Sequence, residues 1–120
     1  MSNYLEKFEN IIGDEQGGFR NKRNTLHQVY VLNEMMLKNT CAYYAFLDIQ
    51  AAYDSVDRSL LWRDLVQYNF DKSFIINMRV LFDKNSCNLA INGKLSSPID
   101  CRRGLLQGSA LSPLLFNIYI

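Results

Sequence analysis

Asp48 is the first residue of the chain whose position favours chemistry. It stands near the end of CAYYAFLDI (residues 41–49), a run of mostly apolar and aromatic residues that predicts a strand buried on both faces. Such a strand would carry the carboxylate to the edge of a sheet. Because Mg²⁺ is held by one or two carboxylates together with substrate phosphates, Asp48 is interpreted as half of a metal site. The competing interpretation of an isolated acid here is a turn residue or a helix cap.

Tyr53 comes shortly after this acid, in the segment DIQAAYDSV. The small residues Ala51 and Ala52 leave room for backbone or a ligand to approach. Taken alone, Tyr53 is better interpreted as a core aromatic residue.

Gln107 and Gly108 precede a helix that is expected to begin at Ser112 and Pro113. Gly108 permits a close approach of the backbone to a ligand, and the Gln107 amide both donates and accepts hydrogen bonds. The N-terminus of a helix also favours phosphate. A polar turn before a capped helix is the alternative that this pattern leaves open.

Arg20, Lys22 and Arg23 place three cations within four residues, beside Gly17 and Gly18. Guanidinium groups bind phosphate oxygens in a bidentate manner, so this cluster could hold a triphosphate. A solvated basic loop is the other interpretation.

Hydrophobic periodicity predicts the elements that position these residues. Helices are expected over 4–12, 25–39, 57–68, 71–84 and from 112 onward, with Thr25, Asp57, Asp71 and Ser112 as N-caps, and strands over 41–49, 86–91 and 94–99. Asn92-Gly93 between the last two strands is a strong hairpin signal. The expected fold class is α+β, with the strands in one sheet and the helices on its back.

Composition excludes several classes of protein. The 120 residues are 48% hydrophobic and 21% charged, which excludes a disordered tail, a collagen-like repeat and a coiled coil. A net charge of +1 indicates no attraction of the whole chain to nucleic acid. The three cysteines form no C-x-x-C pair, so a reducing compartment and free thiols are expected. No apolar run is long enough to predict a membrane helix, and no secretory signal is evident.

Three ordered motifs carry a resemblance to a known family. Q-x-GFR at 16–20, FLDIQAAYDSVD at 46–57 and RGLLQGSALSPLLFNIY at 103–119 resemble reverse transcriptases, most closely those of non-LTR (LINE-type) retrotransposons. The resemblance covers roughly residues 13–120. It implies a fingers-side segment over about 13–40 and a palm segment over 41–120.

This resemblance implies roles for the residues at the first acid. Asp48 and the backbone carbonyl of Ile49 match the ligands of two catalytic Mg²⁺ ions. Tyr53 matches the aromatic residue beneath the incoming sugar, where its ring would exclude a 2′-hydroxyl and favour dNTP over NTP. Asp54 belongs to the family pattern and is expected to hold the local turn.

The resemblance also implies how the nucleotide is held. Gln107 and Gly108 match residues that line the nucleotide pocket, and Arg20, assisted by Lys22 or Arg23, matches the arginine over the triphosphate. The implied partners are an RNA template, a DNA primer and dNTP, with no membrane. The implied location is intracellular, in a nuclear or cytoplasmic ribonucleoprotein.

One family motif is missing. The next motif after the last helix is a hairpin with two adjacent Asp residues, and the 120 residues contain no such pair. We therefore expect a partial domain, truncated before that hairpin and without the thumb, that is inactive alone. Its final helix is expected to expose apolar side chains and to lower solubility: Leu114, Leu115, Phe116, Ile118 and Tyr119. The alternatives are a non-catalytic, reverse-transcriptase-like RNA-binding or scaffold module and a group II intron maturase segment.

Overall fold

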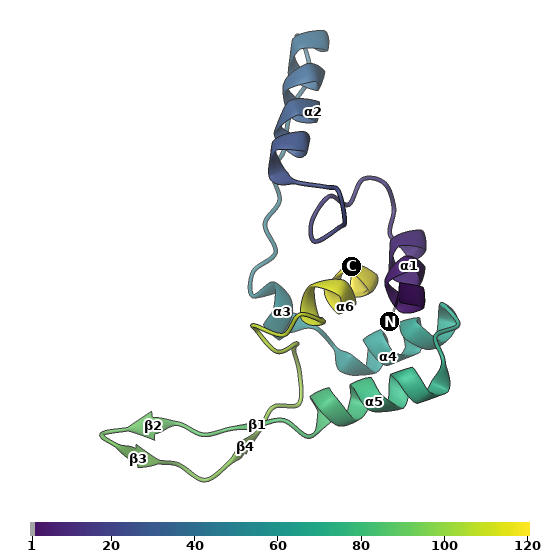
Figure 1. Ribbon diagram of the computed structural model, residues 1–120. Helices are drawn as coiled ribbons and strands as arrows, with labels where there is room; N and C mark the ends of the chain where they lie inside the picture. Colours follow the sequence, from purple (N-terminus) through teal and green to yellow (C-terminus); the bar gives the residue numbers. More distant parts are fainter. Residues whose placement is uncertain (1) are drawn as a thin grey trace. The chain divides into compact units, whose positions relative to one another are not determined.

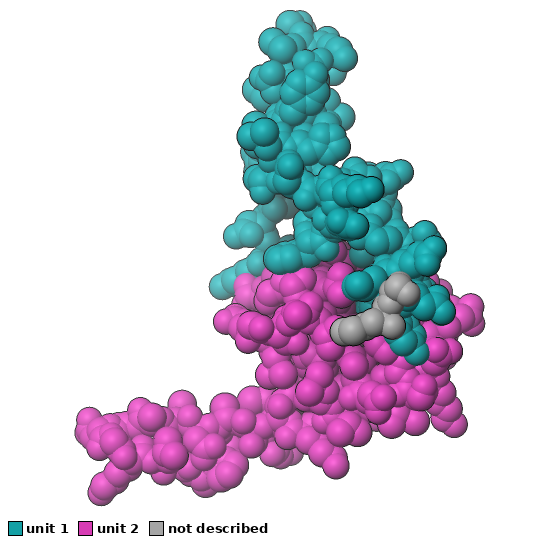
Figure 2. Space-filling model, viewed as in Figure 1, with its two compact units in different colours: residues 1–50 teal, residues 51–120 magenta. Residues whose placement is uncertain are grey.

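The computed structural model describes residues 2–120, which form two compact units. The first comprises residues 1–50 and the second residues 51–120, drawn in teal and magenta in Figure 2. No helix among the described residues is long and apolar enough to cross a membrane.

The first unit contains helices α1 (Ser2–Ile11) and α2 (Thr25–Lys38), joined by an irregular loop (Figure 1). α1 buries Phe8 and is followed by the buried Ile12. α2 begins one residue earlier than the predicted cap: Asn24, not Thr25, is the N-cap, and its Oδ1 accepts a hydrogen bond from the His27 amide at 2.8 Å. An Asn side chain serves this purpose as well as a hydroxyl does.

The apolar side chains along α2 are not buried, although hydrophobic periodicity predicts this helix. The helix has no buried residue, and Leu26, Val29 and Leu37 are exposed. Leu32 is half-buried. Amphipathic spacing specifies an apolar face, but that face becomes buried only if another element packs against it.

Residues 41–49 do not form the predicted strand. Residues 42–49 have no regular secondary structure, and the side chains of Tyr43 and Leu47 are 103% and 95% exposed. A strand exists only through hydrogen bonds to a neighbouring strand. Within residues 2–120, no segment pairs with this one. The composition of residues 41–49 is typical of a buried strand. The described residues contain no strand that pairs with this segment.

The second unit is built around α4 (Arg58–Gln67), which packs against α5 (Lys72–Asp83) and α6 (Ser112–Tyr119). A single turn, α3 (Ala52–Ser55), precedes them and was not predicted. Asp57 caps α4 as expected, because its Oδ1 accepts hydrogen bonds from the amides of Ser59 and Leu60 at 2.8 and 3.4 Å. The apolar core of these helices includes Leu61, Leu65, Ile75, Phe82 and Leu115.

α6 differs from the expectation of an exposed final helix. Leu115 and Ile118 are buried, and Leu114, Phe116 and Tyr119 are half-buried. The helix packs on α4, which shields this apolar side.

Ser112 is also not the N-cap of α6. Leu111 occupies that position, and the Ser112 hydroxyl donates a hydrogen bond of 2.6 Å to the Leu106 carbonyl. The side chain of Ser112 therefore closes the preceding loop, and Pro113 still lies in the first turn.

The hairpin at Asn92-Gly93 is confirmed (Figure 1). β2 (Ala90–Ile91) pairs antiparallel with β3 (Lys94–Leu95), and β1 (Ser86–Cys87) pairs with β4 (Ile99–Asp100). Both turn residues have positive φ, 50° and 76°, which is the conformation that a two-residue turn of this kind requires.

The two ladders are separated by a bulge. Asn88 and Leu89 lie opposite three residues, 96–98, and Pro98 has no amide to donate. Ser96 holds the junction: its amide donates to Leu89 and its hydroxyl accepts from the Leu89 amide. The strands thus form two small ladders within one arm. The fold mixes helices and strands as predicted, but not as one sheet backed by helices.

Candidate functional site

The segment of Tyr53 is bound to the segment that leads into Gln107. The Gly104 amide donates to the Val56 carbonyl, and the Leu105 amide donates to the Tyr53 carbonyl, each at 2.9 Å. These backbone hydrogen bonds join α3 to the residues after the hairpin. Residues 51–57 of the second motif and the start of the third motif are therefore brought together within the second unit.

Gly104 is the residue that permits this contact. Its φ is +82°, and a Cβ atom built there would lie 2.9 Å from the Cα of Asp54 and 3.1 Å from the Tyr53 carbonyl oxygen. A side chain would thus be both strained and obstructed. In the sequence, Gly104 was noted only as part of the motif at 103–119. A glycine is required there because of a contact with residues distant in sequence, which sequence reasoning missed.

The ring of Tyr53 is half-buried and packs against Phe116 of α6. The ring centroids are 5.4 Å apart with an interplanar angle of 87°, an edge-to-face arrangement. One part of the ring is therefore fixed by the core, while another part reaches the surface. This geometry accommodates both the core interpretation and the sugar-contacting interpretation of Tyr53.

Gln107 and Gly108 lie in an exposed loop between Leu106 and α6. Gly108 has a φ of +88°, and no atom lies within 4 Å of where its Cβ would be. The loop is held by the Ser112 hydroxyl on Leu106 and by the Ser109 hydroxyl, which accepts from the Leu111 amide at 3.3 Å. The loop therefore presents an open backbone and an amide side chain at its surface.

Arg58 is a buried residue that sequence reasoning missed. Its guanidinium donates four hydrogen bonds to backbone carbonyls: Gly104 at 2.7 Å, Phe82 at 2.5 Å, Cys101 at 2.7 Å and Arg103 at 3.1 Å. Arg58 thereby connects α4, α5 and the segment before Gln107. One signal could have revealed it, since Arg58, Leu61 and Leu65 share one helical face.

Asp48 and Ile49 lie in the irregular end of the first unit, and both are exposed. Among the described residues, no group of three or more His, Cys, Asp and Glu side chains could hold a metal ion. Asp48 therefore offers one carboxylate, which does not make a complete Mg²⁺ site. Its assignment as a metal ligand stays a prediction.

Arg20 makes a defined set of contacts inside the first unit. Its Nε donates to Glu9 Oε2 at 2.9 Å, and its Nη1 donates to the Gly13 carbonyl at 2.6 Å. Its side chain is only 9% exposed. Hydrogen bonds from the Asn21 amide and from Arg20 lower the pKa of Glu9. As the structure stands, Arg20 anchors the loop between α1 and α2.

Arg23 pairs with Asp14 at 2.8 Å, across the same loop. Arg20, Arg23, Asp48 and Ile49 thus belong to the first unit, whereas Tyr53, Gln107 and Gly108 belong to the second. Within the second unit, the structure brings the segment of Tyr53 beside the segment that leads to Gln107 and Gly108.

The whole chain matches one protein family. The sequence model described as reverse transcriptase (RNA-dependent DNA polymerase) matches residues 1–120. The chain belongs to the reverse transcriptase family.

Relatives of this reverse transcriptase segment come from transposable elements. It is 28% identical over 102 residues to the transposon TX1 uncharacterized 149 kDa protein of Xenopus laevis, covering 82% of the chain and 8% of that protein. It is 32% identical over 76 residues to the Pol polyprotein from type-2 retrotransposable element R2DM of Drosophila melanogaster, and the match covers 63% of the chain and 7% of that protein. It is 29% identical over 118 residues to the probable RNA-directed DNA polymerase from transposon BS of Drosophila melanogaster, and the match covers 91% of the chain and 12% of that protein.

These relatives confirm the resemblance to reverse transcriptases of non-LTR retrotransposons. The reverse transcriptase segment spans about a tenth of their length, between 7% and 12%. No solved structure matches the chain at a significant level.

Proposed function

We propose that the chain is a fingers–palm segment of an RNA-directed DNA polymerase that, within the whole protein, adds dNTP to the 3′-hydroxyl of a DNA primer on an RNA template. The observation that carries this proposal is the pairing of Tyr53 with Leu105 across Gly104. It places the residue proposed to contact the sugar beside the loop proposed to contact the nucleotide. The family match over residues 1–120 supports it.

Asp48 and the Ile49 carbonyl are proposed as metal ligands. Two Mg²⁺ ions, when bound in the complete enzyme, would activate the primer hydroxyl and stabilise the leaving pyrophosphate. Among the described residues, no group of three or more His, Cys, Asp and Glu side chains could hold these ions. We therefore propose that the 120-residue chain alone does not extend a primer.

Tyr53 is proposed to select the sugar. Its edge-to-face contact with Phe116 restricts the ring, so that the exposed part is held in one position. A fixed ring beneath the incoming sugar leaves no space for a 2′-hydroxyl, whereas a mobile ring could move aside and admit it. Gln107 and Gly108, in the adjoining open loop, are proposed to line the same pocket.

Arg20 is proposed to bind the triphosphate, with Arg23 assisting. Both guanidinium groups are paired with carboxylates, Glu9 and Asp14. A triphosphate would replace these carboxylates with phosphate oxygens, which form hydrogen bonds of similar strength. The loop would then be anchored by the substrate in place of Glu9.

The test is primer extension by the whole protein with Asp48→Asn. Activity should fall by at least a thousandfold, because an amide cannot replace a charged ligand (an order-of-magnitude expectation for a lost metal ligand). Asp64→Asn on α4 is the matched control, since Asp64 forms its ion pair with the neighbouring Arg63 and lies outside the proposed pocket. Retained activity in Asp48→Asn would overturn the metal assignment. RNA binding without any extension by the unaltered protein would favour a scaffold module.

A further inference from the structure

We propose that a cationic hollow on the second unit binds phosphate groups of an RNA backbone. The hollow has a volume of about 260 Å³ and is lined by Arg58, Ser59 and Trp62 of α4, Arg79 and Asp83 of α5, and Arg102. None of these residues belongs to the proposed nucleotide pocket. The proposed function enters only in the choice of RNA as the source of the phosphate.

The charge of the hollow is the first argument. Three arginines and one aspartate line it. Within the described part of the chain, Arg58 has no carboxylate at ion-pair distance, and its partners are neutral carbonyls. Arg58 is 5% exposed, so a formal positive charge with no paired carboxylate is buried in the wall of the hollow, where carbonyl oxygens accept its hydrogen bonds. Buried charge of this kind attracts an anion, because water screens it little.

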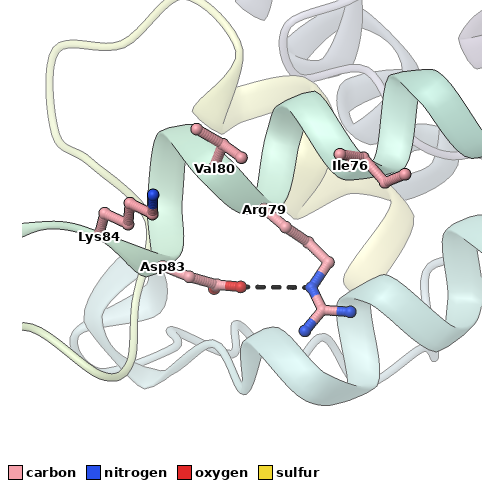
Figure 3. A pocket seen from close by; sticks show the side chains of 5 residues that line it. All are labelled: Ile76, Arg79, Val80, Asp83 and Lys84. Atoms are coloured by element: carbon pink, nitrogen blue, oxygen red, sulfur yellow. Dashed lines mark hydrogen bonds and ion pairs between the residues drawn. The ribbon is translucent and has the colours of Figure 1, made fainter.

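Asp83 does not cancel this charge. One of its oxygens accepts from the Trp62 indole at 3.4 Å and the other from Arg79 Nε at 3.3 Å, the ion pair drawn in Figure 3. The carboxylate is thus occupied by its own neighbours. Arg79 uses only Nε in this pair, and its terminal nitrogens make no hydrogen bond to the residues that the structure describes.

Arg102 supplies a second accessible guanidinium. Its side chain is 87% exposed, and its ion pair with Asp100, at 3.7 Å, is long and solvated. Such pairs contribute little and exchange readily for a better partner. Two accessible arginines at the rim of a cationic hollow can each hold a phosphate oxygen pair in a bidentate manner.

The hollow offers no aromatic surface on which a nucleobase could stack. Its aromatic residue, Trp62, is only 7% exposed, so its ring cannot stack on a nucleobase. The remaining donors are guanidinium groups and the Ser59 hydroxyl, which suit phosphate and sugar. Binding is therefore expected to be independent of sequence and strongly dependent on salt.

Trp62 provides a direct readout, because it is the only tryptophan of the chain and lines the hollow. The experiment titrates the 120-residue chain with a short oligouridylate RNA and, separately, with inorganic phosphate. Both titrations contain a chelator and no nucleotide, and indole fluorescence is recorded. Arg79→Gln and Arg102→Gln are compared singly and together with the control Arg63→Gln. Arg63 lies on the same helix, is 70% exposed and does not line the hollow.

RNA should change the Trp62 emission, and the double variant should bind at least about tenfold more weakly at low salt. The slope of log affinity against log salt should fall by about 0.7 for each arginine removed, as expected for single strands. Arg63→Gln should match the unaltered chain. The proposal would be overturned if Arg63→Gln weakened RNA binding as much as the double variant does. It would also be overturned if the chain did not bind RNA, or if Trp62 responded to inorganic phosphate but not to RNA. Because no metal or dNTP is present, these outcomes do not depend on Asp48 and leave the polymerase proposal to its own test.

Discussion

The amide of Leu105 donates a hydrogen bond of 2.9 Å to the carbonyl of Tyr53. This bond connects the turn after the first acid to the loop before the last helix. It forms only because Gly104, beside it, lets the two backbones approach.

Gly104→Ala should destabilise the second unit by about 2 kcal/mol or more. The left-handed conformation costs an alanine about 1–2 kcal/mol, and the contact with Asp54 adds an overpacking cost. Gly93→Ala is the matched control, because its φ is also positive, +76°, but its Cβ would meet open space. The free energies of unfolding in urea should therefore differ between the two variants. Equal losses of unfolding free energy in the two variants would show that the close approach at Gly104 does not contribute to the destabilisation.

Arg58→Met should lower the free energy of unfolding by about 3 kcal/mol or more. The substitution removes four hydrogen bonds and leaves buried carbonyl oxygens without their donor. Arg63→Met, on the exposed side of the same helix, should change stability by no more than about 0.5 kcal/mol. Urea unfolding monitored by Trp62 fluorescence measures both. A small effect of Arg58→Met would contradict its role as a connection between α4, α5 and the segment 101–104.

Glu9→Gln should remove a pH-dependent contribution to stability. The pKa of Glu9 is lowered from its ordinary value of 4.5 by hydrogen bonds from the Asn21 amide and Arg20. A lowered folded-state pKa stabilises the protein above the unfolded value, and this stabilisation is lost as the pH falls through the folded value. The melting temperature of the unaltered chain should exceed that of Glu9→Gln at neutral pH. The two should converge in acid below pH 4.5.

A difference in melting temperature that persisted unchanged into acid would argue against an ionised Glu9 as the partner of Arg20. Lys38→Gln controls for loss of a surface ion pair, since Lys38 pairs with Glu34 at 3.4 Å and is 74% exposed. It should change stability little at any pH.

Tyr53→Val should raise the use of ribonucleotides by the whole protein. The smaller side chain would leave space for a 2′-hydroxyl, so the ratio of kcat/KM for dNTP over NTP should fall by about tenfold or more, the size of an ordinary steric discrimination. Tyr53→Phe keeps the ring on Phe116 and should retain the discrimination. Unchanged sugar selectivity in Tyr53→Val would remove Tyr53 from this role and leave it as a core residue.

Local signals were the ones that sequence reasoning interpreted correctly. The Asn92-Gly93 turn, the Asp57 cap and the helices over 58–67 and 72–83 depend on residues close together in the chain. Their conformational preferences act within a few residues, so their spacing is sufficient to predict them.

Two local expectations were wrong, the N-caps of α2 and α6, and the larger errors depended on the elements that pack against a segment. Residues 41–49 have the composition of a buried strand but no strand to pair with among the described residues, and α2 has an apolar stripe that nothing buries. Burial in α6 was underestimated for the opposite reason, since α4 covers it. Periodicity predicts which side chains tend to be buried, but it does not predict which element packs against them.

By itself, the sequence determined the family, the order of the motifs and the local turns, because these reside in residue identity and short-range spacing. Only the tertiary structure decided that Gly104 must be a glycine, that Arg58 is a buried connector and that Arg79 and Arg102 share one hollow. Each of these depends on atoms that meet across long stretches of chain. Contacts of that kind are created by packing, and no local preference encodes them.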